Sequence, residues 1–561
     1  MKTTLFSLAV VSCQLTGALA GPIDTPYKPV TLADYGTFSG LVVTETFTGK
    51  PLPSPVDAWL GMDYATQPVG DKRFRAVDWP APFDGIKPAT EFKKACPQAV
   101  TAVLPSEDQA EDCLQFNVWR TPGVPLDEKL PVMVWFMGGA FNRGNQKLFD
   151  GGSFVANSPR PMVFVSFHHR IGALGFPTSD LFERHDGLNL GVRDSRLLLE
   201  FVQKHISSFG GDPNTVTIGG LSAGAHGVGI QHVGNHSDSA GKPLFARVYY
   251  MSGSSTARAF PGVDYPLYQK QFSEFLERTG CNSTGNDDEA TIACLRAVPW
   301  DAIRDASVGI FNKYDKSITW PWQPVQGGPL FAKPGSQSGI DGTFYHVPVI
   351  SSSTTDEGRR YIPGNLETEK DFLDFMHNIA PALTEDDMNM ISDLYPDPVT
   401  DPNSPYQNSM NSTQFSRLSD AWSDYAYICP SQETSYRSAV AGLPVWKMRW
   451  NAGDNLPAWR GIQHATDPAY TWAEPTVEFP ELGKAQHAYI ASFALTGNPN
   501  TYRLAGSPEW PNYEPEGYGI ESAAPDQLVM NPSGPEIEKD DARRAACLFW
   551  RDPERAPRLN K

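Results

Sequence analysis

One serine of this chain lies in a pattern that would make it a nucleophile. Ser222 is the centre of Gly220-Leu221-Ser222-Ala223-Gly224, which follows a β-branched run and leads into small residues that a helix tolerates. In such a turn the chain passes sharply from strand to helix and presents the hydroxyl on a strained tip. The positions two before and two after the serine must therefore be very small. A plain Gly/Ser turn would require neither the preceding strand nor the following helix, so we predict that Ser222 is a nucleophile.

The groups that assist such a serine should follow other strands of the same sheet. Short apolar runs of this kind are typical of strands that are buried on both faces of a largely parallel sheet. They span residues 130–136, 162–167, 215–218, 247–251, 347–350 and 443–450. Between two of them, residues 194–209 place apolar side chains on one helical face. The alternation predicts an α/β fold, in which the chemistry gathers where the strands end.

Two segments resemble the signatures of a known family. The first is 209–225, which contains the serine pattern, and the second is 111–119, Glu-Asp-Cys-Leu-Gln-Phe-Asn-Val-Trp. Both are similar to the type-B carboxylesterase/lipase family, and the chain looks most like its secreted fungal members, over about residues 40–550. The resemblance implies an α/β-hydrolase fold: a large, mixed, mostly parallel sheet flanked by helices, with inserted helical segments. It also implies one domain over residues 21–561.

Acyl transfer also needs hydrogen-bond donors for the charge that develops on the carbonyl oxygen. The run 130–136 is followed by Met137-Gly138-Gly139-Ala140, and residues without bulk let backbone N–H groups approach an anion. The family's pattern at this place implies donors from Gly139 and Ala140. The residue after the nucleophile, Ala223, supplies the third N–H.

The histidine that accepts the serine proton should follow both other members of the triad, because the order in this fold is serine, acid, histidine. His464 lies in a loop after the run 443–450 and matches the family's Gly-x-x-His position. The other candidates have ordinary structural explanations, at the start of a strand, in helical contexts or on an elbow helix that leads away from the site. They are His346, His377, His487, His226 and His232.

The acid should orient the histidine and stabilise its charged form. The run 347–350 leads to Asp356-Glu357-Gly358, and the family's acid is the glutamate of Asp-Glu-Gly, which implies Glu357. Asp356 remains the alternative. Two residues depart from the family: Leu221 stands where many relatives carry an acidic residue, and Met137 stands where His or Tyr is common. Leu221 argues against a cholinesterase that binds cationic substrates, and both changes favour apolar substrates.

Several features predict export. Residues 1–20 combine Lys2, an apolar stretch and Ala18-Leu19-Ala20, as a signal peptide does. Six cysteines follow it, and loop closure favours pairing neighbours, although the spacing alone leaves the connectivity open. The family implies the pairs Cys96–Cys113, Cys281–Cys294 and Cys429–Cys547. Glycosylation sequons start at Asn235, Asn282 and Asn411.

The formal charge of −18 argues against a nucleic-acid or anionic-membrane partner. No metal site or cofactor is predicted, since no cysteine lies in a C-x-x-C pair or near clustered histidines. We find no stable membrane anchor, and the oligomeric state stays open. The expected substrate is a small-molecule or lipid ester.

Three functional hypotheses remain. The loop that Cys96 and Cys113 would close, residues 97–112, would form the lid in lipase relatives, yet its one apolar stretch is 101–104. A short lid of this kind favours the first hypothesis, a secreted carboxylesterase, over the second, a triacylglycerol lipase. An esterase that tailors a metabolite is a variant of the first hypothesis. A catalytically silent binding member of the fold is the third, and the presence of Ser222, Glu357 and His464 argues against it.

Overall fold

The computed structural model describes residues 27–234, 236–285, 287–327, 330–453 and 456–561. The predicted signal peptide and the sequon residue Asn235 lie outside these ranges. The described strands are β1 (Pro29–Leu32), β2 (Gly36–Ser39), β3 (Leu41–Glu45), β4 (Pro51–Asp63), β5 (Ile86–Pro88), β6 (Gln115–Arg120), β7 (Leu130–Phe136), β8 (Val163–Phe167), β9 (Gly211–Leu221), β10 (Arg247–Met251), β11 (Val349–Thr354), β12 (Val445–Trp450), β13 (Asp526–Asn531) and β14 (Gly534–Lys539).

One 11-stranded sheet carries the fold, in the order β14-β13-β12-β11-β10-β9-β7-β8-β6-β4-β3. The strands from β8 to β13 pair in parallel, whereas β14 at one end and β6, β4 and β3 at the other pair antiparallel. A separate three-stranded sheet contains β1, β2 and β5. The predicted α/β-hydrolase fold, with its large and mostly parallel sheet, is confirmed.

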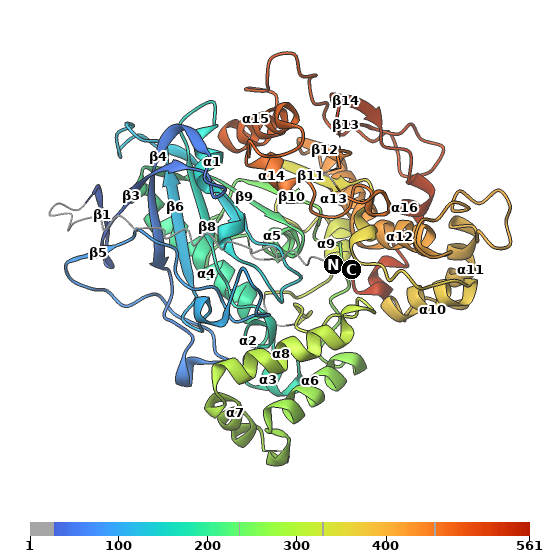
Figure 1. The fold of residues 1–561 in the computed structure, drawn as a ribbon, viewed down its shortest axis with the longest axis horizontal. Helices are drawn as coiled ribbons and strands as arrows, with labels where there is room; N and C mark the ends of the chain where they lie inside the picture. Colours follow the sequence, from blue (N-terminus) through green and yellow to red (C-terminus); the bar gives the residue numbers. More distant parts are fainter. Residues whose placement is uncertain (1–26, 235, 286, 328–329, 454–455) are drawn as a thin grey trace, which may run out of the picture.

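The helices surround this sheet. They are α1 (Gly151–Ala156), α2 (Gly172–Gly175), α3 (Asp180–Arg184), α4 (Leu190–His205), α5 (Ala223–Gly234), α6 (Pro266–Thr279), α7 (Asp288–Ala297), α8 (Trp300–Asp315), α9 (Gly335–Asp341), α10 (Glu369–Ile379), α11 (Glu385–Leu394), α12 (Phe415–Ser423), α13 (Cys429–Val440), α14 (Pro468–Thr471), α15 (Pro480–Thr496) and α16 (Arg544–Trp550). In Figure 1, α4 and α5 lie on one side of the central strands and α15 lies on the other.

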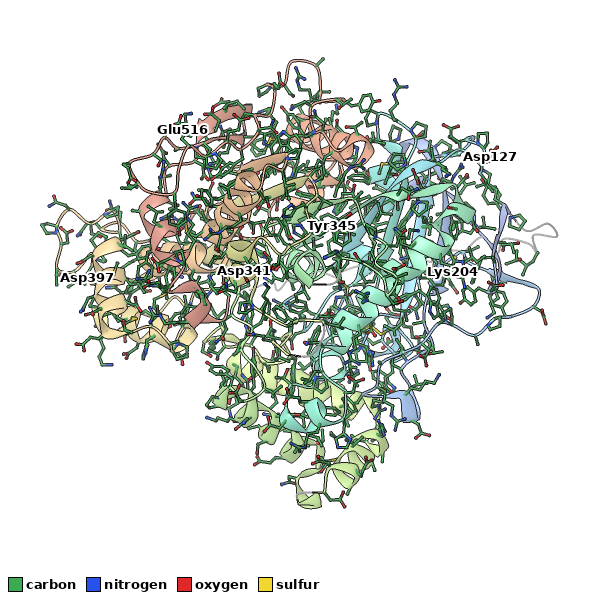
Figure 2. The ribbon with its side chains drawn as sticks, turned by 180° about the vertical axis from the view of Figure 1, so that it is seen from behind. Asp127, Lys204, Asp341, Tyr345, Asp397 and Glu516 are labelled. Atoms are coloured by element: carbon green, nitrogen blue, oxygen red, sulfur yellow. A yellow bond between two sulfur atoms is a disulfide. The ribbon has the colours of Figure 1, made fainter. Side chains whose placement is uncertain are left out.

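The inserted helical segments form two outlying groups. Helices α6, α7 and α8 project below the sheet in Figure 1. Helices α10 and α11 lie at the right side of the molecule in the same view. Each group has its own apolar cluster, while the largest cluster follows the sheet from Val30 to Met530. Seen from behind, Asp127 and Asp397 mark opposite ends of the molecule (Figure 2). None of the described helices combines the length and apolar character that a membrane crossing needs.

Two strands are longer than their apolar runs. The run 215–218 belongs to β9, which continues to Leu221 directly before the serine. The run 347–350 leads into β11, whose second half is polar yet buried. The polar residues Ser351 to Thr354 stay in the strand because β10 and β12 flank it and satisfy its backbone groups. These extensions carry both strand ends to the same edge of the sheet, where the predicted site lies.

Candidate active site

Ser222 lies between the end of β9 and the start of α5, in a left-handed conformation with φ of 58°. A non-glycine residue at positive φ is uncommon and stores strain. The turn is closed by the backbone of Ser222, whose N–H donates to the carbonyl of Met251 at 2.9 Å. A Cβ at Gly220 would lie 2.5 Å from the backbone of Gly224, and one at Gly224 would lie 2.2 Å from the carbonyl oxygen of Phe136. The two glycines are therefore required by close backbone contacts.

The loop after β7 turns beside this serine. Gly139, Ala140 and Phe141 all have positive φ, and a Cβ at Gly138 would lie 3.3 Å from Cβ of Ser222. The carbonyl of Ala140 accepts hydrogen bonds from the side-chain amides of Asn142, at 2.8 Å, and of Gln323, at 2.9 Å. The Ala140 carbonyl is thus held by two side-chain amides.

The three predicted donors have no partner within the described part of the chain. Neither Gly139 N–H nor Ala140 N–H donates to another described group there, and the same holds for Ala223 N–H. Ala223 is the first residue of α5, so its N–H has no carbonyl one turn earlier in the helix. Such groups at a helix N-terminus favour an anion.

Glu357 and His464 are in contact. The Oε2 atom of Glu357 lies 2.5 Å from Nδ1 of His464, and Oε1 accepts the N–H of Thr354 at 2.7 Å. Both side chains are buried. The opposite ring nitrogen of His464, Nε2, has no hydrogen-bond partner among the described residues. A carboxylate on Nδ1 fixes the tautomer whose Nε2 accepts a proton.

Asp356, the alternative acid, has a different role. Its Oδ2 atom accepts the N–H of Ile462 at 2.9 Å, and its Oδ1 atom pairs with Arg359 at 3.2 Å. Asp356 therefore braces the loop that carries His464 and makes no contact with the imidazole. Of the two carboxylates, the structure brings Glu357 to the histidine.

The other histidines lie elsewhere, with one exception. His346 and His377 are exposed, His487 bonds the carbonyl of Thr471, and His232 lies between Tyr250 and the carbonyl of Tyr345. His226 differs from the expectation that α5 would carry it away from the site. Its ring lies 6.0 Å from that of Tyr427, which in turn lies 4.5 Å from that of His464. Burial lowers the pKa of His226 well below its usual range, aided by the nearby charge of Arg258.

Comparison with known proteins decides the family. The sequence model of the carboxylesterase family matches residues 28–533. The chain is 54% identical over 535 residues to secreted lipase 4 of Gibberella zeae, with 95% of each chain covered. It is 28% identical over 501 residues to lipase 1 of Geotrichum candidum, covering 80% of this chain and 85% of that one. The crystal structure of Aspergillus niger EstA superposes with a TM-score of 0.80 at 26% identity, covering 95% of this chain and 99% of that one.

This chain belongs to the carboxylesterase family. The resemblance seen in segments 111–119 and 209–225 is thereby confirmed, and the protein is a carboxylic ester hydrolase.

The carboxylesterase has an aromatic wall around its histidine that the sequence did not reveal. Tyr361 lies 5.4 Å and Tyr427 lies 4.5 Å from the His464 ring, measured between ring centroids. Trp422 packs on both tyrosines, at 4.8 and 5.4 Å. Burial raises the pKa of both tyrosines, and it raises that of Tyr427 well above the usual range. Uncharged rings thus exclude water from the imidazole.

A second buried carboxyl lies near the triad. Asp467 comes three residues after His464 and is fully buried. Neither of its carboxylate oxygens has a hydrogen-bond partner among the described residues. Burial, together with the neighbouring charge of Glu357, raises the pKa of Asp467 to about 7. In sequence, an acidic residue shortly after the base is the only signal of this group.

The loop closed by the first disulfide is hydrogen-bonded to the loop after β7, which contains the predicted oxyanion donors. The structure contains Cys96–Cys113, Cys281–Cys294 and Cys429–Cys547, the pairs that the family implied. Within the loop 97–112, the side chain of Gln98 donates to the carbonyl of Gly144 at 2.7 Å and accepts its N–H at 2.9 Å. Val100 and Val103 are exposed at the tip of this loop. The loop therefore combines a fixed base with a small apolar tip.

Two residues that departed from the family are buried. Leu221 is buried at the end of β9, and Met137 packs beneath the oxyanion loop, 2.9 Å from where a Cβ of Gly144 would lie. The sequon residues Asn282 and Asn411 are exposed.

Proposed function

We propose that this protein is a secreted serine esterase that cleaves carboxylic esters through an acyl-enzyme, with Ser222, His464 and Glu357 as its triad. Oγ of Ser222 bonds the carbonyl carbon while its proton passes to Nε2 of His464. Glu357 stabilises the imidazolium through Nδ1. The oxygen of the tetrahedral intermediate accepts hydrogen bonds from the N–H groups of Gly139, Ala140 and Ala223.

The intermediate collapses when His464 returns the proton to the departing alcohol, which leaves the acyl group on Ser222. A water molecule then attacks the acyl carbon and gives its proton to Nε2. Collapse of the second intermediate releases the carboxylic acid and restores the serine hydroxyl. The observation that carries this proposal is the buried contact of Glu357 with His464, whose other ring nitrogen has no hydrogen-bond partner among the described residues.

An active-site test separates chemistry from folding. A fluorophosphonate should label Ser222 covalently, and Ser222→Ala should abolish both labelling and turnover of 4-nitrophenyl butyrate while thermal unfolding stays the same. Turnover by Ser222→Ala equal to that of the native enzyme would overturn the assignment of the nucleophile.

Triacylglycerol hydrolysis is the second candidate. It is supported by the 54% identity to a protein named secreted lipase 4 and by the exposed Val100 and Val103 on the lid loop. The short apolar tip supports the esterase instead, because little apolar surface would be gained at an oil–water interface. An acyl chain-length profile, run beside Ser222→Ala, distinguishes the two. A maximum at long-chain emulsions with activation above their solubility limit would favour the lipase.

We also propose the cellular context. Export is supported by the similarity to a secreted protein and by the three disulfides, which persist in oxidising surroundings. We expect residues 21–561 to act as one catalytic domain with glycans on Asn282 and Asn411. Mass spectrometry of the secreted protein tests the start of the mature chain and each glycan.

A further inference from the structure

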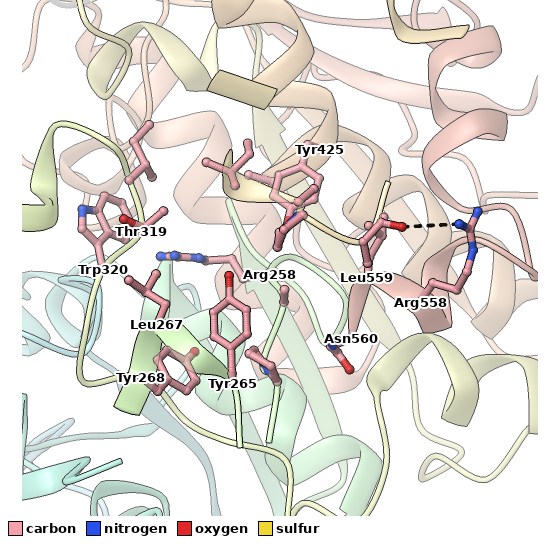
Figure 3. Close-up of a pocket in the computed structure, with 18 of the residues that line it drawn as sticks. Arg258, Tyr265, Leu267, Tyr268, Thr319, Trp320, Tyr425, Arg558, Leu559 and Asn560 are labelled. Atoms are coloured by element: carbon pink, nitrogen blue, oxygen red, sulfur yellow. Dashed lines mark hydrogen bonds between the residues drawn. The ribbon is translucent and has the colours of Figure 1, made fainter. Parts of the chain in front are cut away.

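A cavity of about 330 Å³ lies beside the triad, between the loop after β10 and the helices α6, α10 and α12. Its lining is mostly apolar and includes the aromatic rings of Tyr265, Tyr268, Trp320, Trp422 and Tyr425. None of the described residues that line it is acidic. Figure 3 shows the side chain of Arg258 extended among these residues toward Trp320.

This cavity is one aromatic layer away from the histidine. The ring of Trp320 lies 5.4 Å from that of Tyr361, which lies 5.4 Å from that of His464. The residue after Trp320 is tied to the oxyanion loop, because the carbonyl of Pro321 accepts the side-chain N–H of Asn142 at 3.0 Å. The cavity is thus connected to His464 and to the loop after β7 through packed side chains.

Arg258 has an unusual environment. Its guanidinium lies over the ring of Trp320, 4.3 Å from the centroid, and makes no ion pair or hydrogen bond with any described residue. Arg558, which also lines the cavity, offers a contrast: it pairs with Asp387 at 3.0 Å and points away from the centre of the cavity in Figure 3. One of the two cations is thus balanced by a carboxylate, whereas the other has only aromatic faces.

The neighbouring charges strengthen this asymmetry. Phe311 stacks on Trp320 at 6.1 Å, and Arg143 of the oxyanion loop lies 5.7 Å from the centre of Phe311. Arg360, which is exposed, reaches the carbonyl of His464 at 3.5 Å. Carboxylates are also close by, since Asp315 accepts the indole N–H of Trp320 at 2.7 Å and Asp387 pairs with Arg558, but neither carboxylate pairs with Arg258 in the described part of the chain. A partly buried cation of this kind gains most from a carboxylate, which accepts charge-assisted hydrogen bonds from guanidinium N–H groups.

We infer that Arg258 forms an anion subsite and that the enzyme acts on esters whose acyl or alcohol part carries a carboxylate. The apolar chain between the ester and the carboxylate would pack on Trp320 and its aromatic neighbours, while the guanidinium binds the charged end. This inference rests on the proposed esterase function and specifies its substrate class.

Kinetics provide the first test. Mono-4-nitrophenyl esters of adipic, suberic and sebacic acids are compared with neutral 4-nitrophenyl esters of equal chain length. A second pair carries the carboxylate, or its methyl ester, on the phenol of a phenyl butyrate. For at least one length or position, Arg258→Gln should lower the ratio of anionic to neutral kcat/KM by about 10–100-fold, mainly through KM. Arg258→Lys should retain part of the ratio, and the control Arg558→Gln should retain all of it.

The pattern of loss identifies the half of the ester that enters the cavity: the dicarboxylic series reports the acyl side and the phenol pair the alcohol side. A ratio that stays within twofold of the native value in both series would overturn the inference. If the native protein hydrolysed no ester at all, the proposed function would be refuted. The anion subsite would then be decided by the binding measurements, which need no turnover.

Binding measurements need no turnover. Calorimetry on Ser222→Ala should detect hexanoate more strongly than hexanamide, and the double variant Ser222→Ala/Arg258→Gln should lose that preference. Equal affinity for the acid and the amide in Ser222→Ala would overturn the subsite even if the enzyme hydrolyses esters.

Discussion

Replacing Asp467 with asparagine should change how the stability of the protein depends on pH. Burial and the charge of Glu357 raise the pKa of Asp467 from its ordinary 3.8 to about 7. Between these values the folded protein keeps a proton that the unfolded chain has released, so the free energy of unfolding falls as pH rises. Each pH unit costs about 1.4 kcal/mol while Asp467 stays protonated and less near pH 7, where it is half ionised, which amounts to about 2 kcal/mol between pH 5 and pH 7.

Asp467→Asn removes this slope, because the amide is neutral throughout. Urea unfolding of both proteins at pH 5, 6 and 7 gives the comparison, since all other groups titrate alike and cancel in the difference. The unfolding free energy of the variant should rise by about 2 kcal/mol relative to that of the native protein between pH 5 and pH 7. Asp127→Asn, at an exposed position, is the control and should leave the difference flat. A flat difference for Asp467→Asn as well would show that Asp467 is charged in the folded state and refute the reasoning.

Three further substitutions test the site and its frame. Glu357→Gln leaves an amide that cannot stabilise the imidazolium, so kcat on 4-nitrophenyl butyrate should fall ~10³–10⁴-fold; a loss below tenfold would contradict its place in the triad. Gly224→Ala would bring a Cβ to 2.2 Å from the carbonyl of Phe136 and should destabilise the fold by about 1–3 kcal/mol. Its control, Gly227→Ala in the same helix, meets only an ordinary 3.4 Å contact and should gain about 0.5–1 kcal/mol in thermal unfolding; equal effects would refute the close-contact argument. Replacing Cys429 and Cys547 with serine opens a disulfide with a sequence separation of 118 and should lower the unfolding free energy by about 5 kcal/mol in the chain-entropy account. Denaturant titration measures it, and an unchanged midpoint would contradict a stabilising role.

The sequence was most informative where local patterns carry the chemistry. The turn at Ser222 could be predicted because close backbone contacts, within the turn and with β7, leave no room for a side chain at its glycines. The strand ends could also be predicted, since continuous apolar runs mark strands that are buried on both faces. The length of β11 was not predicted, because polar residues such as Ser352 have a low strand propensity. They remain in the strand because pairing with β10 and β12 outweighs that propensity.

The surroundings of His464 could not be predicted in the same way. Tyr361 and Tyr427 lie far apart in sequence, and only the packing of α12 and the following helical turn against the segment after β11 brings them together. His226 remained near the site for a similar reason. One helical turn beyond Ser222 is too short a distance for α5 to carry it away, and the ring of Tyr427 covers it.

The electrostatic character of the binding site is the point on which the structure changes the argument most. Leu221 and Met137 suggested an uncharged pocket, but both are buried in the frame and neither lines the cavity. The charge near the triad comes from Arg258, which lies in the loop after β10. No sequence motif marks this residue, and only the structure shows that it lies among aromatic rings. A guanidinium that has no ion pair with any described residue favours substrates of negative charge over cationic ones.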